Sequence, residues 1–159
     1  DCLGQPVPET ALYAERVDLG SRQRAPATDR RCQRAFRHAS ALLIDESAFA
    51  KKGDLSAGVA RQWNGRLGKI DNSQVGVFAA MVRDRVAALV EGELYVPEEC
   101  FADPQRGREA GIPEEMEFRT KGEIALSMIH RLRREGLRRL YRVRCRLRPS
   151  AVAVARPGG

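Results

Sequence analysis

Runs of apolar residues mark three strand candidates along the chain. Residues 41–44 form a short apolar run that ends at Asp45, which indicates a buried strand with a carboxylate at the point where the strand emerges. Residues 75–82 and 86–94 are two further apolar runs joined by a short polar link, a spacing that favours an antiparallel hairpin. The start of the second run fits a helix equally well, because Ala-Ala-Leu is a helix-forming sequence.

The segments between these runs carry turn signals. Residues 51–54 (Lys-Lys-Gly-Asp) predict a turn, and residues 59–63 form a weaker strand candidate. Glycines and an Asp-Asn pair between positions 65 and 72 predict loops and turns there. Residues 98–118 are highly charged and contain two prolines, so we expect a loop with one helical turn.

The clearest helix signal covers residues 121–135. Thr120 can cap this helix, and Glu123 occupies the third following position, as in a capping box. The apolar face that we expect on the helix consists of Ile124, Leu126, Met128, Ile129 and Leu132. Over residues 140–148, from Tyr141 on, apolar residues alternate with arginine, which is typical of a half-exposed strand with one arginine-rich face.

Charge is distributed unevenly over the 159 residues. Residues 1–118 hold 16 Lys and Arg against 19 Asp and Glu, whereas residues 119–159 hold 12 against 2. A basic end of this kind favours a polyanionic partner such as nucleic acid, although a solvated charged tail explains it equally well. No apolar run is long enough to predict a membrane helix. The four cysteines lie far apart and predict reduced thiols in a cytoplasmic protein rather than a metal site.

Asp45 is the strongest candidate for chemistry. A carboxylate on a rigid strand suits a hard divalent cation such as Mg²⁺, which prefers oxygen ligands. Judged from its own position alone, an aspartate here is more often a turn or cap residue. Two-metal phosphoryl transfer also needs further acidic groups that converge on the same point.

A group of basic residues suggests contact with DNA phosphates. The candidates are Lys51, Lys52, Arg61 and Lys69, and Trp63 with its neighbouring glycines would let a DNA strand approach closely. A solvated polar hairpin explains the same residues, and the residues alone favour that interpretation.

Several segments in fixed order carry a family resemblance. Residues 45–53 are D-E-S-A-F-A-K-K-G, residues 56–63 are S-A-G-V-A-R-Q-W, and residues 65–78 contain G-x-x-G-K and N-S-Q-V-G-V-F. Further along come L-Y-V-P at 94–97, A-G-I-P at 110–113, and F-R-T-K with E-I-A at 118–125. This series closely resembles the block that opens the catalytic domain of one large group of DDE-type bacterial insertion-sequence transposases, and it covers roughly residues 41–137.

The resemblance implies an α/β fold, namely an incomplete ribonuclease-H-like domain with a mixed sheet and flanking helices. It places Asp45 at the position of the first catalytic, metal-binding aspartate. The implied activity is Mg²⁺-dependent cutting and joining of DNA at insertion-sequence ends, in which two metal ions stabilise the entering and leaving oxygens. The implied partner is DNA in the nucleoid of the bacterial cytoplasm.

The chain departs from the family pattern after the helix. There the family has a strand of the form W-V-x-x-D-x-x-Y-G that carries its second catalytic aspartate, whereas residues 140–147 are L-Y-R-V-R-C-R-L and no acid follows Glu135. The family's later catalytic glutamate has no counterpart either. We therefore expect a poorly defined basic segment over 1–38, a partial transposase catalytic domain over 39–137, and a divergent arginine-rich tail over 138–159, with ends created by frameshift or truncation.

Two classes of function follow from these expectations. The first is a transposase fragment that is inactive alone, so that whether it acts as an enzyme stays open. The alternative is a non-catalytic basic DNA-binding module, able to contact an intact transposase chain, or a decayed remnant of the gene. Metal dependence distinguishes the catalytic class from the binding class.

Overall fold

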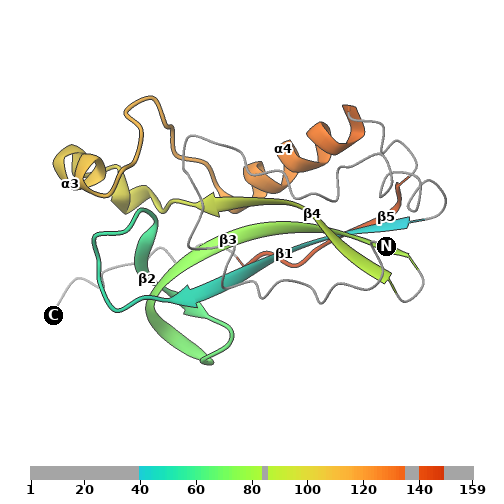
Figure 1. Cartoon of the computed structure of the whole chain (residues 1–159), viewed down its shortest axis with the longest axis horizontal. Coiled ribbons are helices and arrows are strands. Elements are labelled where there is room, and N and C mark those ends of the chain that lie inside the picture. Colours follow the sequence, from blue (N-terminus) through green and yellow to red (C-terminus); the bar gives the residue numbers. More distant parts are fainter. Residues whose placement is uncertain (1–39, 84–85, 135–139, 149–159) are drawn as a thin grey trace, which may run out of the picture.

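The computed structural model describes residues 40–83, 86–134 and 140–148 (Figure 1). The basic segment 1–38 that the sequence sets apart lies outside the described residues. In chain order the elements are β1 (Ser40–Ala50), β2 (Val59–Asn64), β3 (Lys69–Arg83), β4 (Val86–Tyr95), the short 3-10 helix η2 (Glu98–Cys100), α3 (Pro104–Glu109), α4 (Lys121–Arg134) and β5 (Leu140–Cys145).

The five strands form one mixed sheet in the order β2-β3-β1-β5, and β4 also pairs with β3. Strand β1 is antiparallel to β3 and parallel to β5. The first part of β3, residues 69–74, pairs with β2, and the remainder, residues 75–83, pairs with β4. Because β1 occupies the other edge of β3, β2 and β4 follow one another along the same edge. The predicted α/β architecture with a mixed sheet is confirmed at this level.

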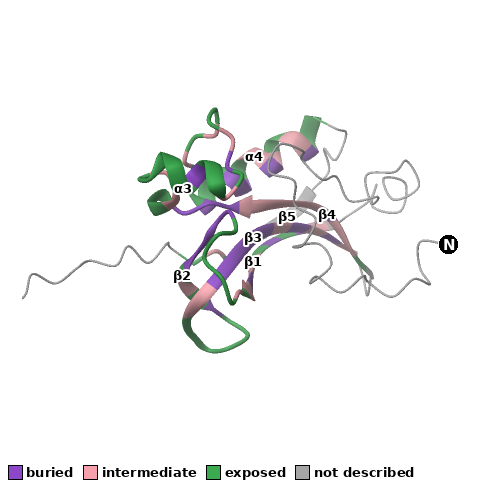
Figure 2. Cartoon of the chain, turned by 60° about the vertical axis from the view of Figure 1, so that its left-hand side comes forward, coloured by how far each residue is buried: buried purple, intermediate pink, exposed green. Residues whose placement is uncertain are grey.

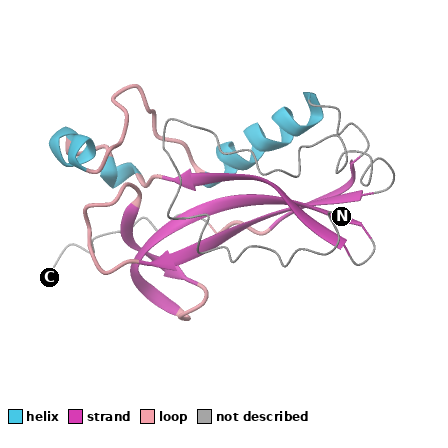
Figure 3. Ribbon diagram, viewed as in Figure 1, coloured by secondary structure: helices cyan, strands magenta, loops and turns pink. Residues whose placement is uncertain are grey.

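One face of the sheet carries the main core. Figures 1 and 3 show α3 and α4 on the same side of the sheet. The buried side of α4 packs against alternate residues of β1 and β3, and Figure 2 shows the middle of β3 as buried. Each such side chain contributes about 1.5–3 kcal/mol when fully buried. The largest core side chains from these three elements are Leu42, Ile44, Val75, Val77, Met81, Ile124, Met128 and Leu132.

The predicted hairpin over residues 75–94 is confirmed as β3 and β4, so the helical alternative for its second half is wrong. The strand expected over 59–63 is confirmed as β2. A strand is also found in the arginine-rich segment, where β5 ends at Cys145. In each of these segments, an apolar run or a two-residue alternation in the sequence corresponds to a strand in the structure.

Strand β1 does not end at Asp45, as the apolar run predicted, but continues to Ala50. The two-residue alternation persists beyond the apolar run, since Ala48 is buried while Asp45 is exposed. Asp45 therefore lies in the middle of a strand. The apolar run was misleading because Glu46 occupies an inward position, where its charge is neutralised by a side chain from α4.

The loop predicted over residues 65–72 is shorter than expected, because β3 begins at Lys69. Polar residues of this stretch pair with β2 in register from Val59–Gln74 to Asn64–Lys69. The true turn covers residues 65–68, and Gly68 has a φ of +65°, which a residue with a side chain rarely adopts. Backbone pairing with β2 overrides the turn signal of the Asp-Asn pair.

Helix α4 begins at the predicted residue and has the predicted capping box. The Glu123 amide donates to Thr120 Oγ1 at 3.2 Å, and the Thr120 amide donates to Glu123 Oε2 at 2.7 Å. The predicted apolar face was wrong at Leu126, which is 55% exposed, whereas Ala125 is buried. Leu126 lies two residues after Ile124, which is more than half a turn away from the buried stripe.

Helix α3 begins at Pro104, a residue that the sequence suggested as a helix breaker. Proline suits the first turn of a helix, because the missing amide has no intrahelical partner there. Asp103 caps this helix by accepting hydrogen bonds from the amides of Gln105 and Arg106 at 3.0 and 3.1 Å.

Candidate functional site

Asp45 projects from the face of the sheet opposite α4. Its neighbours Ile44 and Glu46 point towards α4, and Ile44 is 1% exposed. Asp45 itself is exposed and lies opposite Phe78 in the pairing of β1 with β3. Its Oδ1 accepts a hydrogen bond from the Glu46 amide at 2.9 Å. The carboxylate is thus fixed on a strand with neighbours on both sides, and the rest of its surface faces outwards.

On the side of β5, the residue beside Asp45 is Arg146. Strand β5 runs parallel to β1 with Ile44 paired to Cys145. One residue further on, the Arg146 amide donates a hydrogen bond to the Ile44 carbonyl at 3.0 Å. Since paired residues of neighbouring strands point to the same face, the Arg146 side chain belongs to the face of Asp45.

The described residues do not fit a two-metal site at Asp45. Within residues 40–83, 86–134 and 140–148, no three His, Cys, Asp or Glu side chains gather closely enough to hold a metal ion. The adjacent acid, Glu46, points to the opposite face of the sheet. The two described cysteines, Cys100 and Cys145, are free thiols. On the β5 side of Asp45, the register leads to Arg146, a cation, and not to an acid.

A buried ion pair behind Asp45 fixes β1 to α4. Lys121 Nζ lies 2.7 Å from Glu46 Oε2, and the two side chains are only 10% and 13% exposed. The same ammonium group lies 5.0 Å from the centre of the Tyr95 ring, in cation-π contact. Lys121 is the first residue of α4, where a positive charge opposes the helix dipole. The ion pair with Glu46 offsets that unfavourable position.

This cluster unites three of the segments that carry the family resemblance, namely 45–53, 94–97 and 118–125. The sequence patterns did not reveal it. The one feature of the sequence that indicated this ion pair was the inward position of Glu46 on a strand, because a buried carboxylate requires a partner. Which of the chain's 28 basic residues would provide the partner was not readable from the sequence.

Further ion pairs join α4 to β4. Arg131 Nε lies 2.5 Å from Glu91 Oε1, and its NH2 lies 3.0 Å from Glu93 Oε2. Arg119, just before α4, also pairs with Glu93. These side chains, apart from Arg119, are less than a fifth exposed. Together with Lys121 they hold α4 at two places along the sheet.

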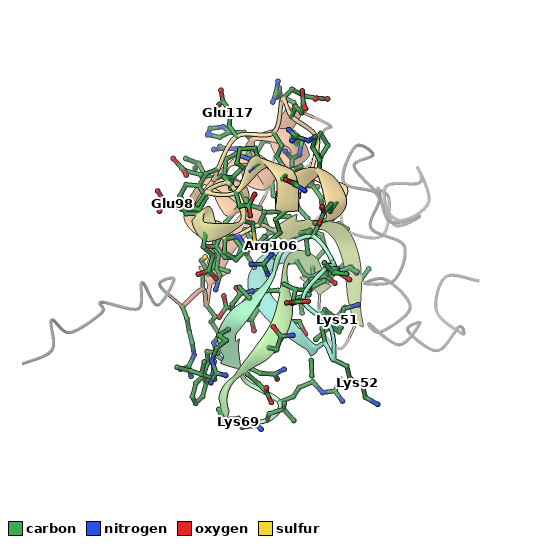
Figure 4. The ribbon with its side chains drawn as sticks, turned by 90° about the vertical axis from the view of Figure 1, so that its left-hand side faces the viewer. Lys51, Lys52, Lys69, Glu98, Arg106 and Glu117 are labelled. Carbon is green, nitrogen blue, oxygen red and sulfur yellow. The ribbon has the colours of Figure 1, made fainter. Side chains whose placement is uncertain are left out.

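The predicted DNA-contacting residues lie where β1 ends and β3 begins. Figure 4 shows Lys51, Lys52 and Lys69 projecting at one end of the molecule. The Lys51 amide donates to the Asn72 carbonyl at 2.9 Å, and Asn72 Nδ2 donates to the carbonyls of Lys51 and Gly53 at 3.2 and 2.9 Å. These bonds hold the backbone of Lys51 and Gly53, on either side of Lys52, against β3.

Arg61 belongs to the same end of the molecule, exposed on β2 and paired in register with Asn72. Asp71 lies 2.9 Å from Lys69, and the hydrogen bond from Lys69 is the main reason why the pKa of Asp71 is lowered, followed by the Asn72 amide. Lys69 therefore has a competing partner for any phosphate.

The segment 98–118, with seven Asp and Glu against two Arg, lies at the same end of the strands but on the side of α3. Arg106 NH2 donates to the Asp54 carbonyl at 3.3 Å there, and Figure 4 shows Glu98 and Glu117 on the side away from Lys52 and Lys69.

The structure does not bring Asp45 and these basic residues into one site. Lys51 follows Asp45 by six residues of extended chain, a separation of about 20 Å at about 3.3 Å per residue. A DNA backbone is long enough to contact both, whereas a small ligand is not. The arrangement suits an extended polyanion.

Comparison with known proteins supports a single family. A sequence model described as DDE superfamily endonuclease matches residues 20–143. A probable transposase for insertion sequence element IS701 from Microchaete diplosiphon is 35% identical over 97 residues, which cover 61% of this chain and 23% of that protein. The chain thus spans less than a quarter of the length of this relative. No solved structure matches the chain. In the described part of the chain, no helix has the length and apolar character needed to cross a membrane.

The buried pair predicts a specific pattern of stability. In Lys121→Met the Glu46 carboxylate stays buried without its counter-charge, so we expect the free energy of unfolding to fall by about 3–5 kcal/mol in urea denaturation. Lys52→Met, at an exposed position, should have little effect. The double variant Glu46→Gln/Lys121→Met should recover much of the stability. Equal stability of Lys121→Met and Lys52→Met would contradict the role assigned to the pair.

Proposed function

The chain belongs to the DDE superfamily endonucleases, and we propose that it forms part of the catalytic domain of a bacterial insertion-sequence transposase. The similarity to a probable insertion-sequence transposase supports this assignment. A transposase of this class cuts and joins DNA by phosphoryl transfer at the ends of its element. Residues 39–137 are the proposed partial catalytic domain, between the basic segment 1–38 and the divergent tail 138–159.

The order and direction of the strands support a ribonuclease-H-like arrangement for this domain. Three antiparallel strands, β1, β3 and β4, are followed by α4 and then by β5, parallel to β1. The family pattern has its second catalytic aspartate on the strand after the helix. The observation that carries the proposal is that β5, the strand after the helix, pairs directly with the strand that bears Asp45.

Asp45 is the proposed catalytic carboxylate and metal ligand of the site. Enzymes of this family generally depend on a divalent metal, which would supply Lewis acidity at the phosphate under attack. Arg146 lies where a second acid is required, and its charge repels a cation. No acid follows Glu135 in this sequence. The chain alone is therefore proposed to be inactive in DNA cleavage.

DNA is the proposed partner, bound at the basic end of the molecule. Lys51, Lys52, Arg61 and Lys69 would contact phosphates, and the acidic segment 98–118 would keep the side of α3 away from DNA. An intact transposase chain is a second proposed partner, because it could supply the missing acids. The proposed location is the bacterial nucleoid.

A non-catalytic DNA-binding module is the second candidate function. The separation of acidic and basic surfaces favours it, since this polarity orients the molecule on DNA without any need for a metal site. It differs from the first candidate in one respect only, namely whether Asp45 contributes to chemistry on DNA.

Cleavage tests the proposed inactivity directly. Incubated with supercoiled plasmid and Mg²⁺ or Mn²⁺, the 159-residue chain should nick no more DNA than its Asp45→Ala variant, because one carboxylate cannot hold two metal ions. Metal-dependent nicking by the natural chain that disappears in Asp45→Ala would show a working site and overturn this part of the proposal.

Salt-dependent binding tests the proposed DNA surface. The triple variant Lys51→Ala/Lys52→Ala/Lys69→Ala should bind duplex DNA more weakly at all sequences. Its slope of log affinity against log salt should fall by about one for each lysine–phosphate interaction that the substitutions remove. Arg108→Ala, which removes an exposed cation from α3, should change neither quantity. If Arg108→Ala weakens binding as much as the triple variant, the basic end is not the DNA surface.

A further inference from the structure

The hairpin formed by β2 and β3 exposes an unusual amount of apolar surface. Of the six large apolar side chains exposed in the described residues, three lie on this hairpin: Trp63, Leu67 and Ile70, at 36%, 48% and 50% exposure. Trp63 and Ile70 are paired in register, so they share one face of the hairpin. Figure 2 shows the turn of the hairpin as exposed, projecting beyond the rest of the sheet.

This exposed surface is held in place by a well-bonded turn. Asn64 is 1% exposed, and its Nδ2 donates to Ser73 Oγ at 3.1 Å. Its Oδ1 accepts from the amides of Arg66 and Leu67 at 3.1 and 3.3 Å, and its carbonyl accepts from the Gly68 amide at 2.9 Å. The hairpin therefore presents Trp63 and Ile70 with little loss of conformational entropy when a ligand binds.

The Trp63 ring already takes part in a stacking contact. The Arg148 guanidinium carbon lies 4.8 Å from the ring centre, the geometry of a planar cation over an indole. With this contact in place, more than a third of Trp63 remains exposed. Part of Trp63 is therefore accessible to a ligand while the Arg148 guanidinium lies over the ring.

The charges around the ring indicate what that partner is. Residues 51–71 contain five Lys and Arg, and only two Asp. One of these acids, Asp71, is already paired with Lys69. A flat aromatic ring beside several cations matches an unpaired nucleotide, whose base stacks while its phosphates bind the cations. An apolar protein surface would match the ring but not the excess positive charge.

We propose that Trp63 is a stacking platform for an unpaired DNA base, with Ile70 packed beside the base and Arg61, on the same face of the hairpin, near a flanking phosphate. The proposal rests on the proposed binding of DNA and adds a preference for single-stranded or unpaired DNA. It assigns this preference to the β2–β3 hairpin, which is separate from Asp45. Duplex DNA keeps its bases stacked on one another and offers the ring only its backbone.

Trp63 is the single tryptophan of the chain, so its fluorescence reports on this site alone. The full chain is titrated with labelled oligodeoxythymidylate and, separately, with a labelled duplex of equal length, while label anisotropy measures binding. We expect the single strand to quench tryptophan emission and the duplex to leave it nearly unchanged. Trp63→Ala should weaken single-strand binding about 5- to 150-fold, whereas Trp63→Phe should keep most of the affinity.

The matched control is Leu67→Ala on the same hairpin, which should bind the single strand as the natural chain does. Binding without quenching, equal quenching by the duplex, or unchanged affinity of Trp63→Ala would each overturn the stacking site while leaving the proposed DNA binding intact. Binding of neither DNA at low salt would instead overturn the proposed function itself, together with this inference.

Discussion

Strand β1 is hydrogen-bonded on both sides, to β3 and to β5, and the rest of the described structure depends on this position. Its alternation sends Ile44 and Glu46 towards α4 and Asp45 to the open face. The Glu46–Lys121 ion pair then fixes the start of α4 on the sheet. The inward carboxylate of Glu46 would destabilise the fold without a partner. Paired with Lys121, it instead positions the strand that bears Asp45.

The same pairing determines what Asp45 can do. Because β5 is parallel to β1, residue 146 is its neighbour on that side, and in this chain residue 146 is arginine. The charges beside Asp45 in the described residues do not favour a divalent metal ion. The proposed DNA contact relies instead on the end of the strand, where the backbone of Lys51 is hydrogen-bonded to Asn72 of β3.

Local patterns predicted much of this fold, and tertiary contacts explain what they missed. The capping box at Thr120 and the β3–β4 hairpin follow from neighbouring residues, so the sequence sufficed. Neighbouring residues did not predict the full length of β1. Glu46 can occupy an inward position on this strand because it pairs with Lys121, which lies 75 positions later in the chain. Asp45 was identified as a candidate from its place on a predicted buried strand and from the family resemblance, but its neighbour Arg146 became apparent only through the pairing of β5 with β1.

Restoring an acid beside Asp45 tests this account most directly. The Arg146→Asp variant should bind Mn²⁺, measured by electron paramagnetic resonance, because two carboxylates would then share one face of adjacent strands. The added binding should vanish in Asp45→Ala/Arg146→Asp. Arg148→Asp makes the same charge change away from Asp45 and should gain nothing. If Arg146→Asp binds no more Mn²⁺ than Arg148→Asp, residue 146 does not lie beside Asp45 as the pairing requires.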